Sequence, residues 1–436
     1  MRMRLLFAVL LTFFPALSQD ARKVIEPVIP PACTSLRAML NRVGASIYAG
    51  DEDKPDTARI QAAIDHCPAG QAVVLQRAAY RTDAFLSGPL QLRRGVVLVV
   101  DGGTYLYASR NPRDYDRIPG ACGTITTDGK RACEPFISAE NAPGSGIMGD
   151  GIIDGRGGET MAGQNITWWD LAHRARAGGS QQNPRLIQVT QSDNFTLYRI
   201  TLLNSPMFFV AYSRGAGFTA WGVKIWAPQR ARNTDGIDPI NATNVTIAHC
   251  YIYTGDDHIA IKAGAGPPTT HMSILHNHFF AGMGIAIGSE TDGGASDILV
   301  NDLSVDGADI GIHIKSNNTR GGLVKGVTYE DVCIRQTQRP IWFETAYGDT
   351  NTKAAGGDKL PVYRDILLRN VRVEDGGRVS MQGLDADHRL GIEFDNVVFR
   401  GPQPRVSTVD TELKVAKNVN APANACIGKF VEFPLR

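Results

Sequence analysis

Two short stretches of the chain place acidic residues immediately before alternating apolar runs. They are "RNTDGIDPI", which begins at Arg232, and "TGDDHIAIK", which begins at Thr254. Together they bring the carboxyl groups of Asp235, Asp256 and Asp257 to the start of two similar runs. If these groups share a small space, their repulsion raises the pKa of at least one of them. One acid can then hold a proton while another stays ionised, which is the division of labour that glycoside hydrolysis needs.

Two other interpretations of these acids compete with catalysis. Asp and Asn are common in turns, where their side chains cap the backbone. Clustered carboxylates can also hold calcium through their oxygen atoms. We favour catalysis because the repeats described next place two of the acids on neighbouring coils, where they face a lysine. We therefore assign no metal and no cofactor.

The elements that must position these acids belong to an internal repeat. Segments of similar pattern begin at Asn244, His271, Asp297 and Gly326, 26 to 29 residues apart. Each contains short strands rich in Val, Ile and Thr, with Asn, Asp and Gly between them. A period of this length with several strands per unit indicates a solenoid. We predict an all-β, single-domain, right-handed parallel β-helix, in which corresponding strands stack about 4.8 Å apart.

Alignment of the last strand of each unit predicts which residues stack in one column. The inward column should contain Ile237, Ile259, Ile285, Ile312 and Ile341. Asp235 and Asp257 fall in another column just before these strands, with Asp256 beside them. Strict alternation would turn one of the adjacent acids inward, so we expect a bend at Gly255 that presents both. Lys262, on the outward side, is a candidate for attracting an acidic polymer.

The chain is expected to fall into three parts. Residues 1–18 are typical of a signal peptide, because Arg2 and Arg4 precede an apolar stretch too short to span a bilayer. Residues 19–70 should form an N-terminal segment with a helix near Ile60 that caps the solenoid, and residues 71–436 the β-helix. The formal net charge of +1 gives no general preference for nucleic acid or a membrane surface. We expect a secreted monomer, periplasmic or extracellular, that binds neither nucleic acid nor a membrane.

The seven cysteines suit an exported protein, although an odd number leaves at least one thiol free. Cys122 with Cys133, and Cys33 with Cys67, are the candidate disulfides. Cys250 lies in an apolar strand and should be a buried thiol. No cysteine spacing is typical of a zinc site.

At four places the chain resembles glycoside hydrolase family 28, the polygalacturonases or pectinases, of the bacterial secreted type. The four blocks are "NTDGID", "GDDHIAIK", "GMGIAIGSET" and "GIHIKS", and the similarity extends from about Ala32 onward. The resemblance implies an inverting hydrolase of α-1,4 bonds between galacturonic acid units, and thus pectin or polygalacturonate, an acidic plant polysaccharide, as the partner. It implies that Asp256 is the general acid and that Asp235 and Asp257 activate water. Acid and base should then lie about 6.5–9.5 Å apart.

The same resemblance implies three further site residues. Asn233 would support the acids, Lys315 would bind a substrate carboxylate, and Tyr347 matches the family's site tyrosine more loosely. Trp342 and Tyr347 are also candidates for stacking on sugar rings.

Two residues depart from the family pattern. Met283 stands where the third block has histidine, and a thioether has no proton to share with the general acid. His313 stands where the fourth block has arginine. A guanidinium group that is always charged and can form two parallel hydrogen bonds is thus replaced by an imidazole, which offers a single, pH-dependent contact. Met283 can instead pack in the groove floor, and His313 can be a surface histidine with its polar atoms satisfied. Phe209 is a third difference, near a position where related chains often carry histidine.

Several functions therefore remain open. The protein can cleave polygalacturonate slowly or at a shifted pH, act on rhamnogalacturonan or a substituted galacturonan, or bind polysaccharide as a β-helix without cutting it. A pectate lyase would share the fold, but it needs calcium and a basic residue that removes a proton. All three acids are present, so we favour hydrolysis.

Overall fold

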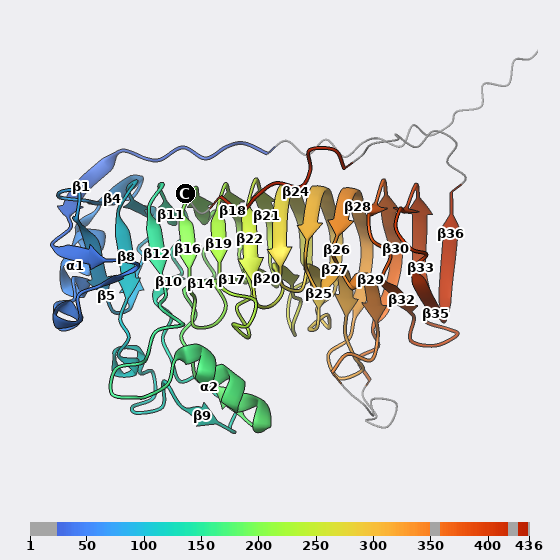
Figure 1. Ribbon diagram of the computed structural model, residues 1–436, viewed down its shortest axis with the longest axis horizontal. Helices are drawn as coiled ribbons and strands as arrows, with labels where there is room; N and C mark the ends of the chain where they lie inside the picture. Colours follow the sequence, from blue (N-terminus) through green and yellow to red (C-terminus); the bar gives the residue numbers. More distant parts are fainter. Residues whose placement is uncertain (1–23, 349–357, 417–425, 435–436) are drawn as a thin grey trace, which may run out of the picture.

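The computed structural model describes residues 24–348, 358–416 and 426–434. The predicted signal peptide, residues 1–18, lies outside these ranges. Within them the chain winds into a parallel β-helix, as predicted, and its coils follow one another along the long axis (Figure 1). No helix among the described residues is long and apolar enough to cross a membrane.

One sheet of eleven parallel strands carries the apolar runs used in the alignment. Its strands are β6 (Leu90–Gln91), β10 (Ile137–Glu140), β14 (Ile187–Thr190), β17 (Val210–Ser213), β20 (Ile237–Ile240), β23 (Ile259–Ile261), β25 (Ile285–Gly288), β27 (Ile310–Lys315), β29 (Arg339–Glu344), β32 (Arg378–Gln382) and β35 (Arg405–Val409).

The other faces of the coils form a sheet of 23 strands, most of them parallel. The strands on its first face are β1 (Ala32–Arg37), β4 (Gln71–Gln76), β7 (Val96–Val100), β11 (Gly146–Met148), β15 (Thr196–Tyr198), β18 (Ala216–Trp221) and β21 (Thr243–Ala248). Those that follow along the chain are β24 (Thr269–Ala281), β26 (Ala295–Asp306), β28 (Leu323–Arg335), β30 (Val362–Arg369), β33 (Leu390–Asp395) and β36 (Thr411–Val415). The remaining strands are β2 (Leu40–Val43), β3 (Ser46–Ile47), β5 (Thr82–Ser87), β8 (Tyr105–Ala108), β12 (Ile152–Asp154), β16 (Thr201–Leu203), β19 (Lys224–Trp226), β22 (Tyr251–Thr254), β31 (Arg372–Val373) and β34 (Val398–Phe399).

The core is built from columns of apolar side chains on successive coils. The strand pairing confirms the predicted inward column, because each of its isoleucines pairs with the next and all five are fully buried, namely Ile237, Ile259, Ile285, Ile312 and Ile341. Burial of one such side chain contributes about 1.5–3 kcal/mol. The repeat thus sets the register of the eleven-stranded sheet, and with it the place of the acids just before each strand.

The expected helix, α1 (Thr57–His66), lies at the N-terminal end of the stack (Figure 1). Ile60 and Ile64 are fully buried against the first coils, so the helix covers apolar surface that the solenoid would otherwise expose. Short 3₁₀ helices occur at Ala49–Asp51, Pro112–Tyr115 and Ala175–Ala177.

A second helix, α2 (Trp168–Arg174), projects from the coils together with the small antiparallel pair β9 (Ile125–Thr126) and β13 (Ser180–Gln181) (Figure 1). Thr167 and Asp170 form a capping box at its start, which satisfies two backbone N–H groups. Trp168 and Trp169, its first two residues, are buried. This segment forms a rim beside the eleven-stranded sheet.

Three disulfides hold the loops and the chain end. Cys33–Cys67 and Cys122–Cys133 are the two candidates from the sequence, and Cys250 is a buried free thiol. The third, Cys333–Cys426, was not predicted. It ties residues 426–434 to the sheet, where the Phe433 ring packs edge-on against Tyr253 and Phe280.

Candidate active site

The acidic residues lie where the coils turn into the eleven-stranded sheet. Asp235 stands two residues before β20, and Asp256 and Asp257 fill the turn between β22 and β23. The chain bends at Gly255 and Asp256, as expected. A Cβ atom on Gly255 would lie 2.1 Å from the carbonyl oxygen of Ala231, so only glycine permits this close approach of two coils.

The three acids meet in one cluster. One carboxylate oxygen from each of Asp235, Asp256 and Asp257 lies within 4.8 Å of the other two. Asp235 and Asp257 are buried, and Asp256 is half-buried. The separation of about 6.5–9.5 Å expected between acid and base refers to whole carboxyl groups and stays a prediction. Asp235 and Asp257 lie close because residues in one column of adjacent coils are only about 4.8 Å apart, and Asp256 precedes Asp257 in the chain.

Two lysines balance the buried carboxylates. Lys315 Nζ lies 2.7 Å from Asp257 Oδ2. Lys262 Nζ lies 3.1 Å from Asp235 Oδ2 and 2.6 Å from Oδ2 of a fourth acid, Asp238, which is fully buried. The role of Lys262 in attracting an acidic polymer stays a prediction. Its ammonium group is committed to two carboxylates within the site.

Four carboxyl groups thus face two ammonium groups, so the cluster cannot be fully ionised without an excess of negative charge. Burial raises the pKa of Asp238 to about 8, and the charge of Asp235 opposes its ionisation further. Burial also raises the pKa of Asp235, although Lys262 favours its charged form. Lys262 is thus the one ammonium group that contacts both of these acids among the described residues, and it can neutralise only one of them.

Asp256 differs from the other acids because no cationic side chain of the described residues contacts it. Its Oδ1 accepts the backbone N–H of Asp257 at 3.0 Å, and its Oδ2 accepts that of Asn233 at 3.3 Å. Burial, followed by repulsion from Asp235 and Asp257, raises the pKa of Asp256 to about 7. Asn233 has a left-handed backbone with φ of 56°, which asparagine tolerates well, and its side chain is held by Gln181 Nε2 at 2.9 Å.

The same trio of oxygens could hold a cation, which was the calcium alternative. Lys262 and Lys315 already place two positive charges on Asp235 and Asp257. A divalent ion at that point would be repelled by both ammonium groups. The donor set of the described residues therefore suits proton transfer better than metal binding.

The residues that depart from the family pattern lie around this cluster. The Met283 backbone N–H donates to the Asp256 carbonyl oxygen at 2.9 Å, and its side chain is half-buried. His313 is buried, so its interpretation as a surface histidine is wrong. Its Nε2 lies 3.0 Å from Glu344 Oε1, and burial lowers its pKa. Tyr347 is half-buried, and its ring centre lies 5.0 Å from Lys315 Nζ.

Comparison with known proteins adds independent information. Residues 117–422 match the model of glycosyl hydrolases family 28. A polygalacturonase of Ralstonia nicotianae is 41% identical over 433 aligned residues, which cover 87% of this chain and 80% of the relative. The chain belongs to glycosyl hydrolase family 28.

Other members of family 28 extend this similarity. An endo-polygalacturonase of Pectobacterium carotovorum is 41% identical, with 88% of this chain and 90% of the relative covered. The solved structure of a polygalacturonase from Erwinia carotovora superimposes with a TM-score of 0.82 at 38% identity and covers 91% of this chain and all of that chain. The protein is thus a glycoside hydrolase with the β-helix of its family.

The family 28 fold brings all the predicted site residues into one region, but sequence reasoning missed part of the column that holds the acids. Continuing the strand register two residues before each strand gives the series Arg185, Phe208, Asp235, Asp257 and Met283 on successive coils. Arg185 and Asp238 were not singled out. The signal for Arg185 was its distance of two residues from the apolar run Ile187–Thr190, the same offset as that of Asp235 from Ile237–Ile240.

Proposed function

We propose that this family 28 protein hydrolyses α-1,4 bonds of polygalacturonate, with Asp256 as proton donor and Asp235 and Asp257 as the pair that activates water. The observation that carries the proposal is the unequal pairing of the acids. Asp235 and Asp257 each contact a lysine, whereas Asp256 contacts no cation of the described residues. This difference suits Asp256 to donate a proton and the two paired acids to accept one.

In the proposed reaction, the Asp256 carboxyl proton passes to the glycosidic oxygen as the bond from that oxygen to C1 breaks. A water molecule attacks C1 from the other face and gives its proton to Asp235 or Asp257. Hydrogen bonds of about 2.7 Å let one water bridge two oxygens up to roughly 5.4 Å apart. The oxygens of Asp235 and Asp257 lie within 4.8 Å of each other, so they suit such a water.

This single displacement inverts the configuration at C1, so the new reducing end is first formed as the β-anomer. A retaining reaction needs a carboxylate nucleophile bonded to the sugar, with about 5–5.5 Å between two carboxyl groups. The short distances in this cluster make the stereochemistry a necessary test. Proton NMR during the first minutes of hydrolysis should show the β-anomer, and an initial α-anomer would overturn the proposed water activation.

Substrate contacts are proposed for the remaining site residues. Lys315 would share its ammonium group between Asp257 and a galacturonate carboxylate, with the Tyr347 ring beside it. His313 would offer one contact through the edge of its ring, and Asn233 would keep Asp256 in place through its backbone N–H. Met283 would border the substrate without a hydrogen bond.

We further propose cleavage within the polymer and action outside the cytoplasm. Internal cleavage is supported by the name of the Pectobacterium relative, an endo-polygalacturonase. Export is supported by the signal-peptide pattern of residues 1–18 and by three disulfides, which persist in oxidising compartments. N-terminal sequencing of the exported protein should begin close to residue 19.

The proposal is tested with purified protein on polygalacturonate, rhamnogalacturonan and xylogalacturonan, with and without a calcium chelator. We expect new reducing ends from polygalacturonate, no ultraviolet-absorbing unsaturated product, and no loss of activity with the chelator. A fast fall in viscosity at low conversion would support internal cleavage. Cleavage of only another polymer, unsaturated products, or binding without cleavage would each overturn the proposal.

A further inference from the structure

A cleft of about 1230 Å³ lies beside the acids, over the strands that precede β20. Its lining runs along β6, β10, β14 and β17 to β20, and four steps of about 4.8 Å give it room for several sugar units in line. It reaches the acids at Gln181, whose side chain holds Asn233 beside Asp256. A polymer bound across the acids would therefore continue into this cleft.

The cationic side chains of the cleft outnumber its anionic ones. Two of the arginines are paired, Arg117 with Glu134 at 2.8 Å and Arg93 with Asp65 at 2.7 Å. Among the described residues, no carboxylate lies within ion-pair distance of the other cationic side chains, which are those of Lys130, Arg131, Arg185 and Arg214.

Arg185 is the one of these that is buried, with 8% of its surface exposed. Its guanidinium donates to Gln188 Oε1 and lies 4.7 Å from the centre of the Phe208 ring. Most arginines so deeply buried are paired with an anion. The position of Arg185, two coils before Asp235 in one column, puts their backbones about 10 Å apart.

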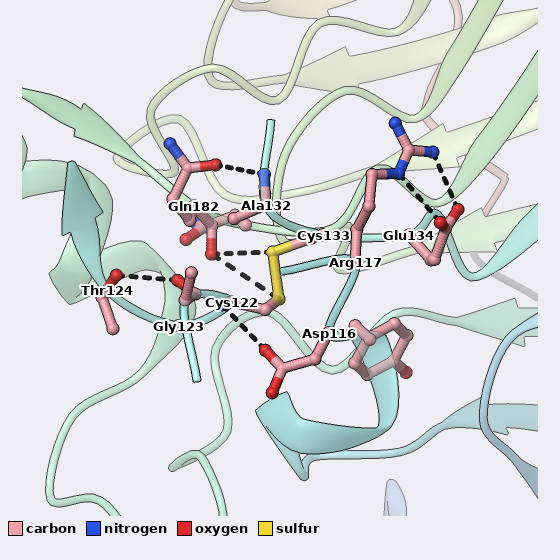
Figure 2. Close-up of a disulfide and its surroundings, with 12 residues drawn as sticks. Asp116, Arg117, Cys122, Gly123, Thr124, Ala132, Cys133, Glu134 and Gln182 are labelled. Atoms are coloured by element: carbon pink, nitrogen blue, oxygen red, sulfur yellow. Dashed lines mark hydrogen bonds and ion pairs between the residues drawn. A yellow bond between two sulfur atoms is a disulfide. The ribbon is translucent and has the colours of Figure 1, made fainter. Parts of the chain in front are cut away.

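Arg131 is exposed on the wall of the same cleft, in a loop that is firmly held. The loop is closed by the Cys122–Cys133 disulfide, and the Ala132 N–H donates to Gln182 Oε1 at 2.8 Å (Figure 2). The Arg117–Glu134 ion pair lies in the same region (Figure 2). The backbone that follows Arg131 is therefore fixed, which limits the order lost when its side chain meets a ligand.

The electrostatics of Arg185 agree with the absence of an ion-pair partner among the described residues. Burial lowers its pKa, and the positive charge of Arg131 acts in the same direction. The nearby charges of Asp238 and Asp235 oppose this effect, but Lys262 already neutralises that pair in part. A carboxylate bound between the two arginines would offset both the burial of the Arg185 charge and its repulsion by Arg131.

We propose that Arg185 and Arg131 form a carboxylate-binding subsite for a galacturonate unit that lies beyond the scissile bond, on the side of the N-terminal coils. The inference rests on the proposed function and adds a specificity-determining site to it. A guanidinium binds a free carboxylate through two charge-assisted hydrogen bonds. A methyl ester is neutral and cannot accept both, so the enzyme should require a non-esterified unit at this position.

The test uses oligogalacturonates of increasing length and the variants Arg185→Lys, Arg185→Met and Arg131→Gln. Wild-type kcat/KM should rise once the substrate is long enough to reach the subsite. Loss of a charge-assisted contact corresponds to about a 10- to 100-fold weaker interaction. In Arg185→Met, kcat/KM should therefore no longer rise with substrate length, because KM for the long substrates increases while kcat changes little. Arg185→Lys should recover only part of this rise, because lysine cannot form the two hydrogen bonds of a guanidinium. Arg131→Gln should show a smaller loss.

Arg364→Gln, on the exposed side of β30, is the matched control and should behave as the wild type. An equal loss on short and long substrates, or an unchanged KM in all three variants, would overturn the subsite. Hexagalacturonate binding to Asp256→Asn, with and without Arg131→Gln, is measured by calorimetry. Because this binding measurement needs no turnover, it separates failure of the subsite from failure of the hydrolase proposal. Equal affinity in these two proteins, or equal affinity of Asp256→Asn for a fully methyl-esterified hexamer, would also contradict the inference.

Discussion

Lys262 Nζ lies 2.6 Å from Oδ2 of Asp238, a carboxyl group with no exposed surface, and it joins this group to Asp235 in the acid cluster. Lys262 is therefore the counter-ion of two buried carboxyl groups, one of which belongs to the three acids. Loss of its charge would disfavour ionisation of both.

Lys262→Met should lower kcat on polygalacturonate at least about tenfold, because one lost pKa unit of charge stabilisation corresponds to about 1.4 kcal/mol. Without its counter-ion, Asp235 would need a higher pH to ionise, so the acid limb of the pH–rate profile should move to higher pH. Asp238→Asn keeps the Lys262–Asp235 pair and should retain most of the activity. The control is Lys325→Met, exposed on β28. Unchanged kcat and acid limb in a folded Lys262→Met protein would contradict this role.

The pH dependence should reflect the raised pKa of Asp256, about 7. Asp256 donates a proton, so the enzyme is competent below this pH and loses activity as pH rises through it. The alkaline limb of kcat/KM reports the free enzyme and should have an apparent pKa near 7. Measurement from about pH 4 to 9 tests this, and a rate that stays constant to pH 9 would exclude Asp256 as the titrating acid.

The substitution pair Met283→His with His313→Arg should raise turnover on unsubstituted polygalacturonate. The Met283 backbone N–H donates to the Asp256 carbonyl oxygen, so an imidazole at position 283 can share a hydrogen bond with the acid, which a thioether cannot do. Arginine at position 313 can pair with Glu344 and keep its charge at all relevant pH values. If a folded double variant shows no gain, the groove is adapted to another substrate.

The Cys333–Cys426 disulfide should contribute to stability but not to catalysis. It closes a segment of 93 residues, and cross-linking a loop of this size stabilises by about 4–5 kcal/mol in the chain-entropy model. Cys333→Ala with Cys426→Ala should therefore lower Tm while kcat at 25 °C is retained. Cys250→Ala, which alters only a buried free thiol, is the comparison for a change of packing. An unchanged Tm would mean that the tail docks without the bond.

The sequence was enough to predict the β-helix and the register of its catalytic strands. The alternation of isoleucines from Ile237 to Ile341 has the same period as the strands, and only one stacking buries all of them. Asp235 and Asp257 then had to share a column. Prediction at this level needs only backbone spacing.

The details that were missed depend on side-chain reach and on distant chain segments. Lys262 was placed on the outward side, but its contacts with Asp235 and Asp238 depend on the reach of its side chain and were not predicted. A surface histidine was one of two interpretations of His313, yet neighbouring coils bury it against Glu344. Cys426 pairs with Cys333 because the end of the chain returns along the solenoid, which no local pattern indicates.

The most direct test of the central claim concerns the proton donor. The kcat of Asp256→Asn is compared with that of the wild type on polygalacturonate and on a galacturonide with a nitrophenol leaving group, which needs no protonation to depart. The exposed Asp387→Asn serves as control. We predict a loss of about 10²- to 10⁴-fold on the polymer and a much smaller loss on the activated substrate. Full activity on the polymer, or an equal loss on both substrates, would contradict the assignment of Asp256 as the general acid.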